Sequence, residues 1–452
     1  MDARRAALQV LEQVDPARQR VQPELDRALE LTGQPGRCTD LVLGVLRNRR
    51  AIDRVISAVG QVQLEYIQRP LLNLIRIAVY ELVYCSQVPV FALIDQAVEL
   101  AGSRRRRRQS SFVNAICRKI AHGVKQRQAQ MDLSRHDLQR ILPTNRNTGC
   151  LFEVDLLPSP GTADYLSLAF SLPRWLAEDW LSRFGLERAF ECGLASIRRP
   201  SVYLQPNLTL TDPQTLLEYL AAAGIEAELH GHGPIRIASP GRIDLLPGYQ
   251  EGHFYVQDPA AASVVELLEI RPGQSVLDLC AAPGGKVLQV YLANKGQCRV
   301  VATDADQQRL EILMANLRRL RLQSVSVIPY AEIGQYVDKH GRFDVVLVDA
   351  PCSNTGVLAR RVEVRFRLSQ QDLSWHASRQ VQLLEKTASV LAPGGVILYS
   401  TCSIQQQENE DVVMAFTKDR PGLVVDSQRL TLPCPGPLDH DGGYAAVIRS
   451  KG

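Results

Sequence analysis

The second half of this 452-residue chain alternates short apolar segments with helical patterns. The apolar segments are SVLDL (275–279), RVVAT (299–303), SVSVIP (324–329), DVVLVD (344–349) and GVILYS (395–400). Such alternation is typical of βαβ units, in which a helix returns the chain so that successive strands are parallel. We therefore expect residues 251–452 to form a doubly wound, Rossmann-like α/β domain that binds its ligands at the carboxyl ends of the strands.

Three further regions precede this domain. Apolar residues recur at helical spacing throughout residues 1–125, which predicts a small all-α bundle. Residues 126–160 turn polar and irregular (KQRQAQ, then PTNRNTGC) and are expected to form a linker. In residues 161–250, two strand-like segments flank the helical pattern PQTLLEYLAAAG (213–224), which favours a small α+β module.

Composition excludes several classes of protein. With 45% hydrophobic and 22% charged residues, the chain has enough apolar material for packed cores. Its ten cysteines contain no CxxC pair, which argues against a zinc site and against a disulfide-stapled scaffold, so we expect free thiols in a reducing cytoplasm and no metal. No apolar run approaches eighteen residues and the N-terminus lacks the pattern of a signal peptide, so we expect neither membrane span nor secretion.

A run of five arginines, Arg104–Arg108, interrupts the helical region. Such a density of positive charge suits contacts with the phosphates of a nucleic acid. A solvated basic loop is an equally good interpretation of the run alone.

The first strand of the expected sheet runs into a loop of small residues before the next helix. Small side chains let a backbone approach a ligand closely, and a helix N-terminus offers free amide donors. Asp304 ends the second strand, where a carboxylate can accept hydrogen bonds from both hydroxyls of a ribose. The loop has neither GxGxxG nor GxxxxGK[ST], which leaves S-adenosylmethionine as the best candidate ligand. The loop residues are Cys280, Ala281, Ala282, Pro283, Gly284, Gly285 and Lys286.

Two cysteines follow the fourth and fifth strands, Cys352 in DAPCS and Cys402 in STCS. One cysteine at the end of a buried strand is usually a small apolar filler, but parallel strands would bring both thiols to one sheet edge beside the cofactor. Carbon 5 of cytosine is too weak a nucleophile to take a methyl group directly, and a thiolate that adds to carbon 6 makes it reactive. Asp349, three residues before Cys352, could stabilise charge at the neighbouring ring nitrogen. Spacing alone leaves open which thiol attacks.

At these motifs the sequence closely resembles the RsmB/Sun type of RNA cytosine-5 methyltransferases, which modify 16S ribosomal RNA. The resemblance rests on YVQDPAA (255–261), DLCAAPGGK (278–286), TDADQQRL (303–310), DAPCSNTG (349–356) and YSTCS (399–403). It implies S-adenosylmethionine as cofactor, with residues 280–286, Asp304 and Asp349 contacting it. It also implies that Cys402 is the nucleophile and that Cys352 assists product release.

The N-terminal region resembles the NusB-like RNA-binding domain of the same enzymes, notably in GVLRNRR (44–50), RIAVYELVY (76–84) and FVNAICRKI (112–120). This resemblance implies ribosomal RNA as the partner, and it favours the arginine run as an RNA contact. We expect a monomer.

Some segments depart from the family pattern. Pro329–Glu332 lacks the usual acid or amide after the third strand, and RRVEVRF (360–366) lacks a proline. Two other functions therefore stay open: a non-catalytic RNA-binding or assembly factor with a decayed methyltransferase domain, and a methyltransferase that acts on transfer RNA.

Overall fold

The structure, a computed structural model, describes residues 1–102, 107–231, 233–238 and 241–451. The chain forms two compact units that do not follow sequence order. The first comprises Met1–Arg199, Leu358–Leu368 and Cys434–Pro437, and the second comprises Pro200–Val357, Ser369–Pro433 and Leu438–Gly452. The four-domain division expected from the sequence therefore remains a prediction about which parts fold independently.

The first unit begins with the expected helical bundle. Its helices are α1 (Ala3–Gln13), α2 (Gln22–Leu31), α3 (Pro35–Arg47), α4 (Arg49–Ala58), α5 (Arg69–Tyr84), α6 (Val90–Ala101) and α7 (Arg107–His122). Most of these helices bury one stripe, as in α1, where Ala6, Ala7 and Val10 are at most 1% exposed, whereas α5 is buried on all sides from Leu72 to Val83. This burial confirms the apolar periodicity as the origin of the bundle. Arg104–Arg106 of the arginine run lie outside the described residues.

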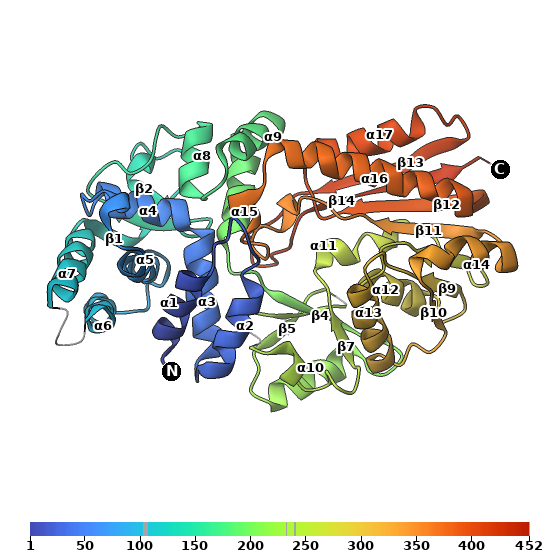
Figure 1. Cartoon of the computed structure of the whole chain (residues 1–452), viewed down its shortest axis with the longest axis horizontal. Coiled ribbons are helices and arrows are strands. Elements are labelled where there is room, and N and C mark those ends of the chain that lie inside the picture. The colour runs from blue at the N-terminus through green and yellow to red at the C-terminus, as the bar shows by residue number, and fades with distance from the viewer. Residues whose placement is uncertain (103–106, 232, 239–240, 452) are drawn as a thin grey trace. The chain divides into compact units, whose positions relative to one another are not determined.

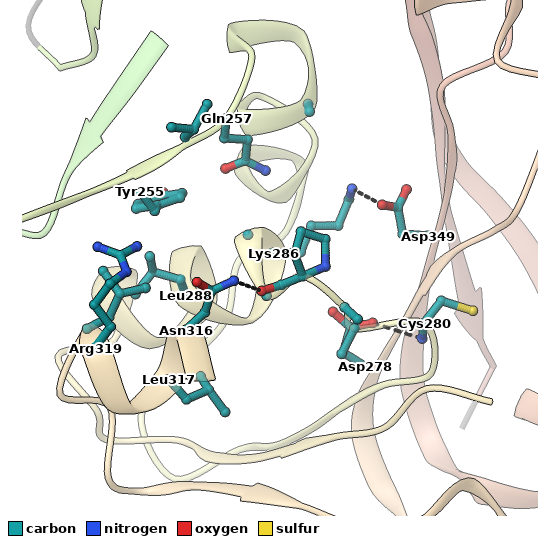
Figure 2. A pocket seen from close by; sticks show the side chains of 18 of the residues that line it. Tyr255, Gln257, Asp278, Cys280, Lys286, Leu288, Asn316, Leu317, Arg319 and Asp349 are labelled. Carbon is teal, nitrogen blue, oxygen red and sulfur yellow. Dashed lines mark hydrogen bonds and ion pairs between the residues drawn. The ribbon is translucent and has the colours of Figure 1, made fainter. Parts of the chain in front are cut away.

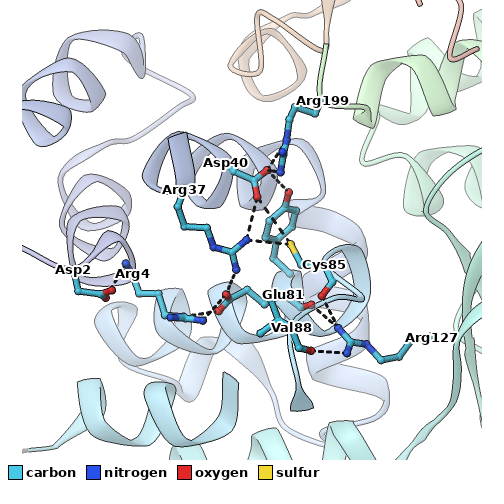
Figure 3. A network of polar contacts seen from close by, with 10 residues as sticks. Asp2, Arg4, Arg37, Asp40, Glu81, Cys85, Val88, Arg127 and Arg199 are labelled. Atoms are coloured by element: carbon cyan, nitrogen blue, oxygen red, sulfur yellow. Dashed lines mark hydrogen bonds and ion pairs between the residues drawn. The ribbon is translucent and has the colours of Figure 1, made fainter. Parts of the chain in front are cut away.

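A buried carboxylate ties the bundle together (Figure 3). Glu81 on α5 is 1% exposed and receives two hydrogen bonds of 2.8 Å from Arg4 on α1 and another from Arg37 on α3. Asp40, also buried on α3, pairs with Arg199 at 2.5 Å. Buried charges persist where partners of opposite sign satisfy them, so these arginines stabilise the two buried carboxylates of the bundle.

Residues 126–160, expected to be a linker, instead form most of a three-stranded antiparallel sheet, and the expectation is wrong. The sheet has the order β1-β3-β2 and comprises β1 (Val124–Gln130), β2 (Ile141–Pro143) and β3 (Thr148–Phe152). The polar residues lie mainly on the exposed side of β1, whereas Ile141, Cys150 and Phe152 are fully buried. The sheet is anchored by Arg127, whose guanidinium donates to the carbonyls of Glu81, Leu82, Cys85 and Val88 at the end of α5 (Figure 3).

Two helices, α8 (Ala163–Ala169) and α9 (Arg174–Ile197), and a segment from much later in the chain complete the first unit. The later segment, Leu358–Leu368, contains the short helix α15 (Val364–Arg367). Its Arg365 is 2% exposed and donates to the carbonyls of Arg47, Phe170, Ser196 and Leu358. Burial lowers the pKa of Arg365 to about 9. A cation satisfied only by backbone carbonyls thus joins this segment to the helical part of the unit.

The second unit opens with a small α+β module, as expected. Its four-stranded antiparallel sheet has the order β5-β6-β4-β7, with α10 (Pro213–Ala222) packed on it through Leu216 and Leu220. The strands are β4 (Val202–Pro206), β5 (Ala227–Leu229), β6 (Ile235–Ile237) and β7 (Phe254–Val256). Asn207, which follows β4, is fully buried and donates to the carbonyls of Gly252 and Leu320, so this side chain joins the module to the larger sheet domain.

The larger sheet has seven strands in the order β10-β9-β8-β11-β12-β14-β13, and the first five are parallel, as the sequence predicts. The antiparallel pair β13 and β14 at one edge was not foreseen. The strands are β8 (Ser275–Asp278), β9 (Arg299–Ala302), β10 (Val325–Val327), β11 (Phe343–Asp349), β12 (Leu391–Thr401), β13 (Leu423–Thr431) and β14 (Gly443–Ser450).

Helices cover both faces of this sheet (Figure 1). In β11, Val345 and Leu347 pack into one core while Val346 and Val348 pack into the other, which explains the uninterrupted apolar run from Val345 to Val348. The connection order reverses beside β8, whose neighbours are β9 and β11, so a crevice is expected at the carboxyl ends there. The helices are α11 (Pro259–Ala262), α12 (Gly285–Ala293), α13 (Gln307–Arg319), α14 (Ile333–His340), α16 (Gln370–Val390) and α17 (Glu410–Thr417).

Candidate active site

The loop between β8 and α12 holds a tight, pinned conformation. Gly284 has φ +114°, and a Cβ atom there would lie 2.9 Å from Leu313, so glycine is required on both counts. From α13, Arg309 donates to the carbonyl of Ala282. Asn316 on the same helix donates to the carbonyl of Pro283 at 2.9 Å (Figure 2). The loop is therefore preorganised without help from a ligand.

Two buried carboxylates flank this loop. Asp278 ends β8, is 1% exposed and accepts a 3.1 Å hydrogen bond from the backbone N–H of Cys280 (Figure 2). Burial, together with the negative charge of Asp349, raises the pKa of Asp278 to about 7. Asp304, after β9, is 4% exposed, and its Oδ2 lies 3.1 Å from Arg309 but accepts no hydrogen bond from the described residues. A buried carboxylate oxygen that lacks a donor suits a ligand hydroxyl.

Two cavities lie along the carboxyl edge of the sheet and both reach Cys280. The first, of about 330 Å³, is lined by Lys286, Asp349, Tyr255 and Gln257 among others (Figure 2). The second, of about 450 Å³, lies beside Asp304. Its other lining residues include Ala305, Arg309, Tyr330, Pro351, Trp375 and Arg379.

The two thiols singled out by the sequence meet at this edge. Asp349 on β11 is paired in register with Ser400 on β12, and the loops that follow bring Cys352 Sγ to 3.1 Å from Cys402 Sγ. Cys352 is 6% exposed, whereas Cys402 is more accessible and donates to Asn354 Oδ1 at 3.2 Å. The hydrogen bond with Cys402, together with burial, raises the pKa of Cys352 well above its ordinary value. The two thiols thus differ in their access to solvent.

Asp349 joins the thiol loops to the loop after β8. Its Oδ2 lies 2.7 Å from Lys286 Nζ, and its Oδ1 accepts a 2.9 Å hydrogen bond from Ser400 (Figure 2). The carboxyl group is 42% exposed, so it is held in place and still open to a ligand. The sequence had not indicated that Lys286 pairs with Asp349.

Two lining residues were missed by sequence reasoning. Trp375 on α16 is 55% exposed beside the second cavity, and the guanidinium of Arg379 lies 4.7 Å from its ring centroid. They carried no motif, because only the fold brings α16 to the loop after β10. Tyr330 lies in Pro329–Glu332, the segment that departs from the family pattern, and its hydroxyl is buried without a hydrogen-bond partner in the described part of the chain.

A doubly wound sheet has a small-residue loop after its first strand and, after its second, a buried acid with one carboxylate oxygen that accepts no described hydrogen bond. With a crevice at this edge, the arrangement defines an S-adenosylmethionine-dependent methyltransferase. Residues 265–434 match the family model of the 16S rRNA methyltransferase RsmB/F, and residues 1–122 match the NusB family. The chain belongs to the RsmB/F family and is an RNA methyltransferase.

Individual relatives agree with this assignment. Ribosomal RNA small subunit methyltransferase B of Yersinia pseudotuberculosis is 30% identical, over 99% of this chain and 98% of the relative. The protein of the same name from Cronobacter sakazakii is 28% identical, over 91% and 90%. A crystal structure of a methyltransferase homologue from Pyrococcus horikoshii is 25% identical with a TM-score of 0.54, covering 65% of this chain and all of that one. The crystal structure of PH0851, 21% identical over 99% and 98%, shares the fold with a TM-score of 0.71.

Two further findings bear on ligands and membranes. Among the residues that the structure describes, there is no group of three or more His, Cys, Asp or Glu side chains arranged to hold a metal ion. In the same residues, none of the helices is both long enough and apolar enough to cross a membrane.

Proposed function

We propose that this chain methylates carbon 5 of a cytosine in 16S ribosomal RNA through a covalent adduct on Cys402, with Cys352 serving product release. The observation that carries the proposal is the 3.1 Å separation of the two thiols at the ends of adjacent parallel strands. Two structural cysteines have no need to meet at a ligand-binding edge. Cytosine-5 chemistry, in contrast, requires a thiol nucleophile beside the cofactor.

Cys402 is the better placed of the two thiols for attack. It is more exposed than Cys352, and Asn354 orients its S–H. Cys402 loses its S–H proton to solvent, and the resulting thiolate adds to carbon 6 of the ring, which makes carbon 5 nucleophilic. Asp349, held by Lys286 and Ser400, would in its acid form give a proton to the adjacent ring nitrogen during addition and take it back on elimination, so that negative charge does not build up on the ring.

Cys352 then serves the release step. Once Cys402 is bonded to carbon, it can no longer carry negative charge or share a proton with Cys352. The largest cause of the raised pKa of Cys352 is therefore removed in the adduct, and Cys352 can ionise. As a thiolate it accepts the proton from carbon 5, the Cys402–C6 bond breaks, and Cys402 leaves as thiolate.

The residues around the two cavities fit the cofactor. S-adenosylmethionine supplies an electrophilic methyl group when bound. We assign the binding of the ribose hydroxyls to Asp304, whose Oδ2 lacks a donor. The backbone of residues 280–286 and the carboxylate of Asp349 would contact the rest of the cofactor. Tyr330 and Trp375 are the aromatic surfaces available for the base in the second cavity.

Helix α7 offers the best RNA-contacting surface in the first unit. Its exposed residues include Arg107, Arg108, Arg118, Lys119 and the aromatic Phe112. Cations interleaved with an aromatic ring suit phosphates and unstacked bases. The relatives are named for ribosomal RNA of the small subunit, which favours that RNA over transfer RNA as substrate of a cytoplasmic, monomeric enzyme.

Methyl transfer from labelled cofactor to 16S RNA, followed by bisulfite mapping, tests the proposal. Wild-type protein and the control Cys434→Ala should mark one cytosine, and Cys402→Ala should mark none. Equal labelling by Cys402→Ala would contradict the adduct, and labelling of transfer RNA alone would contradict the substrate. A decayed domain predicts no cofactor binding by titration, whereas we expect saturable binding.

A further inference from the structure

Glu408 accepts hydrogen bonds from the residue that follows each of the two cysteines, and it belongs to neither the cofactor loop nor the thiol motifs. Glu408 follows β12 and is fully buried. Its Oε1 accepts from the backbone N–H of Ser353 at 2.8 Å and from Gln380 Nε2 at 3.2 Å. Its Oε2 accepts from the hydroxyls of Ser353 and Ser403, the latter at 2.6 Å.

Ser353 and Ser403 are the residues directly after the two cysteines. Because both bind the same carboxylate, Glu408 fixes the backbone on the C-terminal side of Cys352 and of Cys402 at once. The serine hydroxyls are also 3.2 Å apart, and Ser403 reaches Thr355 at 3.1 Å. A buried hydrogen-bonded network of this kind rigidifies the groups that it contacts.

We infer that Glu408 is a positioning residue that holds the two thiols together and keeps the proton on Cys352, so that Cys402 is the sulfur that attacks. The inference rests on the proposed function, in which one thiol must add to the base while the other stays protonated until the adduct has formed. Glu408 touches neither the base nor the cofactor in this scheme and acts through Ser353, Ser403 and its charge.

The electrostatics agree with this geometry. The negative charge of Glu408 contributes to the raised pKa of Cys352, after the hydrogen bond and charge of Cys402 and after burial. Other titratable groups near Glu408 are Tyr399 on β12, whose hydroxyl donates to the Glu408 carbonyl, and His376 on α16. Burial lowers the pKa of His376, so this imidazole does not bring a compensating positive charge at neutral pH.

Alkylation of the full-length protein with iodoacetamide, mapped by peptide mass spectrometry, measures the reaction rate of each of the two thiols in the absence of RNA. We expect Cys402 to react at least about 10-fold faster than Cys352 in wild type and in the control Glu410→Gln. In Glu408→Gln the ratio should fall about 10-fold, since one pKa unit changes the thiolate population tenfold. Glu408→Asp, which retains the charge, should keep most of the selectivity. An unchanged ratio in Glu408→Gln would overturn the inference.

The single-turnover rate of 16S RNA methylation tests whether Glu408 positions the thiols for the chemical step. Glu408→Gln should lower the rate at saturating RNA about 100-fold and leave the KM for RNA and the cofactor Kd unchanged. If Glu408→Gln does not fold, Ser353→Ala and Ser403→Ala test the same link: each should slow the step at least about 5-fold, and wild-type rates in both would overturn it. Methylation by Cys402→Ala would instead refute the proposed function and leave the alkylation result standing.

Discussion

Lys286 Nζ lies 2.7 Å from Asp349 Oδ2, so an ion pair joins the loop after β8 to the strand that leads to Cys352. The lysine is 9% exposed and the carboxylate 42% exposed. A partly buried pair of this kind holds its members more firmly than a surface pair, because solvent screens it less. The geometry makes the orientation of Asp349 depend on a residue from the cofactor loop.

Replacing Lys286 by Met should therefore impair chemistry more than folding. Without the ammonium group, Asp349 retains only Ser400 as a described partner and loses its fixed orientation towards the ring. We expect single-turnover methylation to fall about 100-fold while thermal stability changes by less than about 1 kcal/mol. The control is Lys339→Met, an exposed lysine at the end of α14, and equal activity of the two variants would refute this role.

Asp304→Asn should weaken cofactor binding. The substitution keeps the size of the side chain and removes the charge and one acceptor oxygen from the cavity beside it. A charge-assisted hydrogen bond contributes about 1.5–3 kcal/mol, so the Kd should rise about 10- to 100-fold by calorimetry. Asp338→Asn, at an exposed acid on α14, should bind as wild type; an unchanged Kd in Asp304→Asn would show that the ribose lies elsewhere.

Asp278 should make stability depend on pH. Its folded pKa of about 7 is above its ordinary value, so the folded state binds more protons than the unfolded state between about pH 4 and pH 7. Stability from this group is complete below pH 4 and is lost as pH rises through 7. Asp278→Asn should stabilise the cofactor-free protein at pH 8, on the order of 4 kcal/mol, and have little effect at about pH 3.5. Urea unfolding at both pH values tests this, and a stabilisation that is equal at both would contradict it.

Arg365 should be important for the folding of the first unit. Arg365→Leu leaves four buried carbonyls without their donor, which we expect to cost about 3 kcal/mol in the free energy of unfolding. Arg367→Leu, two residues on and 39% exposed, should cost less than about 1 kcal/mol. Denaturant titration distinguishes the two, and similar losses would show that the buried guanidinium contributes little.

The parallel sheet and the bundle were predictable because buried faces of strands and helices require a regular pattern of apolar residues in the sequence. Strands covered on both faces carry uninterrupted apolar runs, as at residues 345–348 in β11, and helices covered on one face repeat their apolar residues at helical spacing. The convergence of Cys352 and Cys402 followed from strand order in the same way. In contrast, β13 has an exposed pattern of mixed polar and apolar residues, and this pattern did not predict a strand. Residues 126–160 contain few apolar residues among many polar ones, so their strands could not be predicted either.

The polar interior of the site could not be predicted from local pattern. Glu408 and Asn409 lie in the run IQQQENED, which has the composition of an exposed surface, yet both are fully buried. Their burial depends on donors from Ser353, Thr401 and Ser403, which only the folded sheet brings close. The inclusion of Leu358–Leu368 in the first unit is likewise a tertiary property, since nothing in RRVEVRF marks Arg365 as buried.

The central claim is that Cys402 attacks the base and Cys352 releases it, and trapping tests it most directly. Cys352→Ala, incubated with 16S RNA and S-adenosylmethionine, should accumulate a covalent protein–RNA complex on denaturing gels. The double variant with Cys402→Ala should form none. A complex that persists in the double variant, or that forms in Cys402→Ala alone, would contradict the assignment of the two sulfurs.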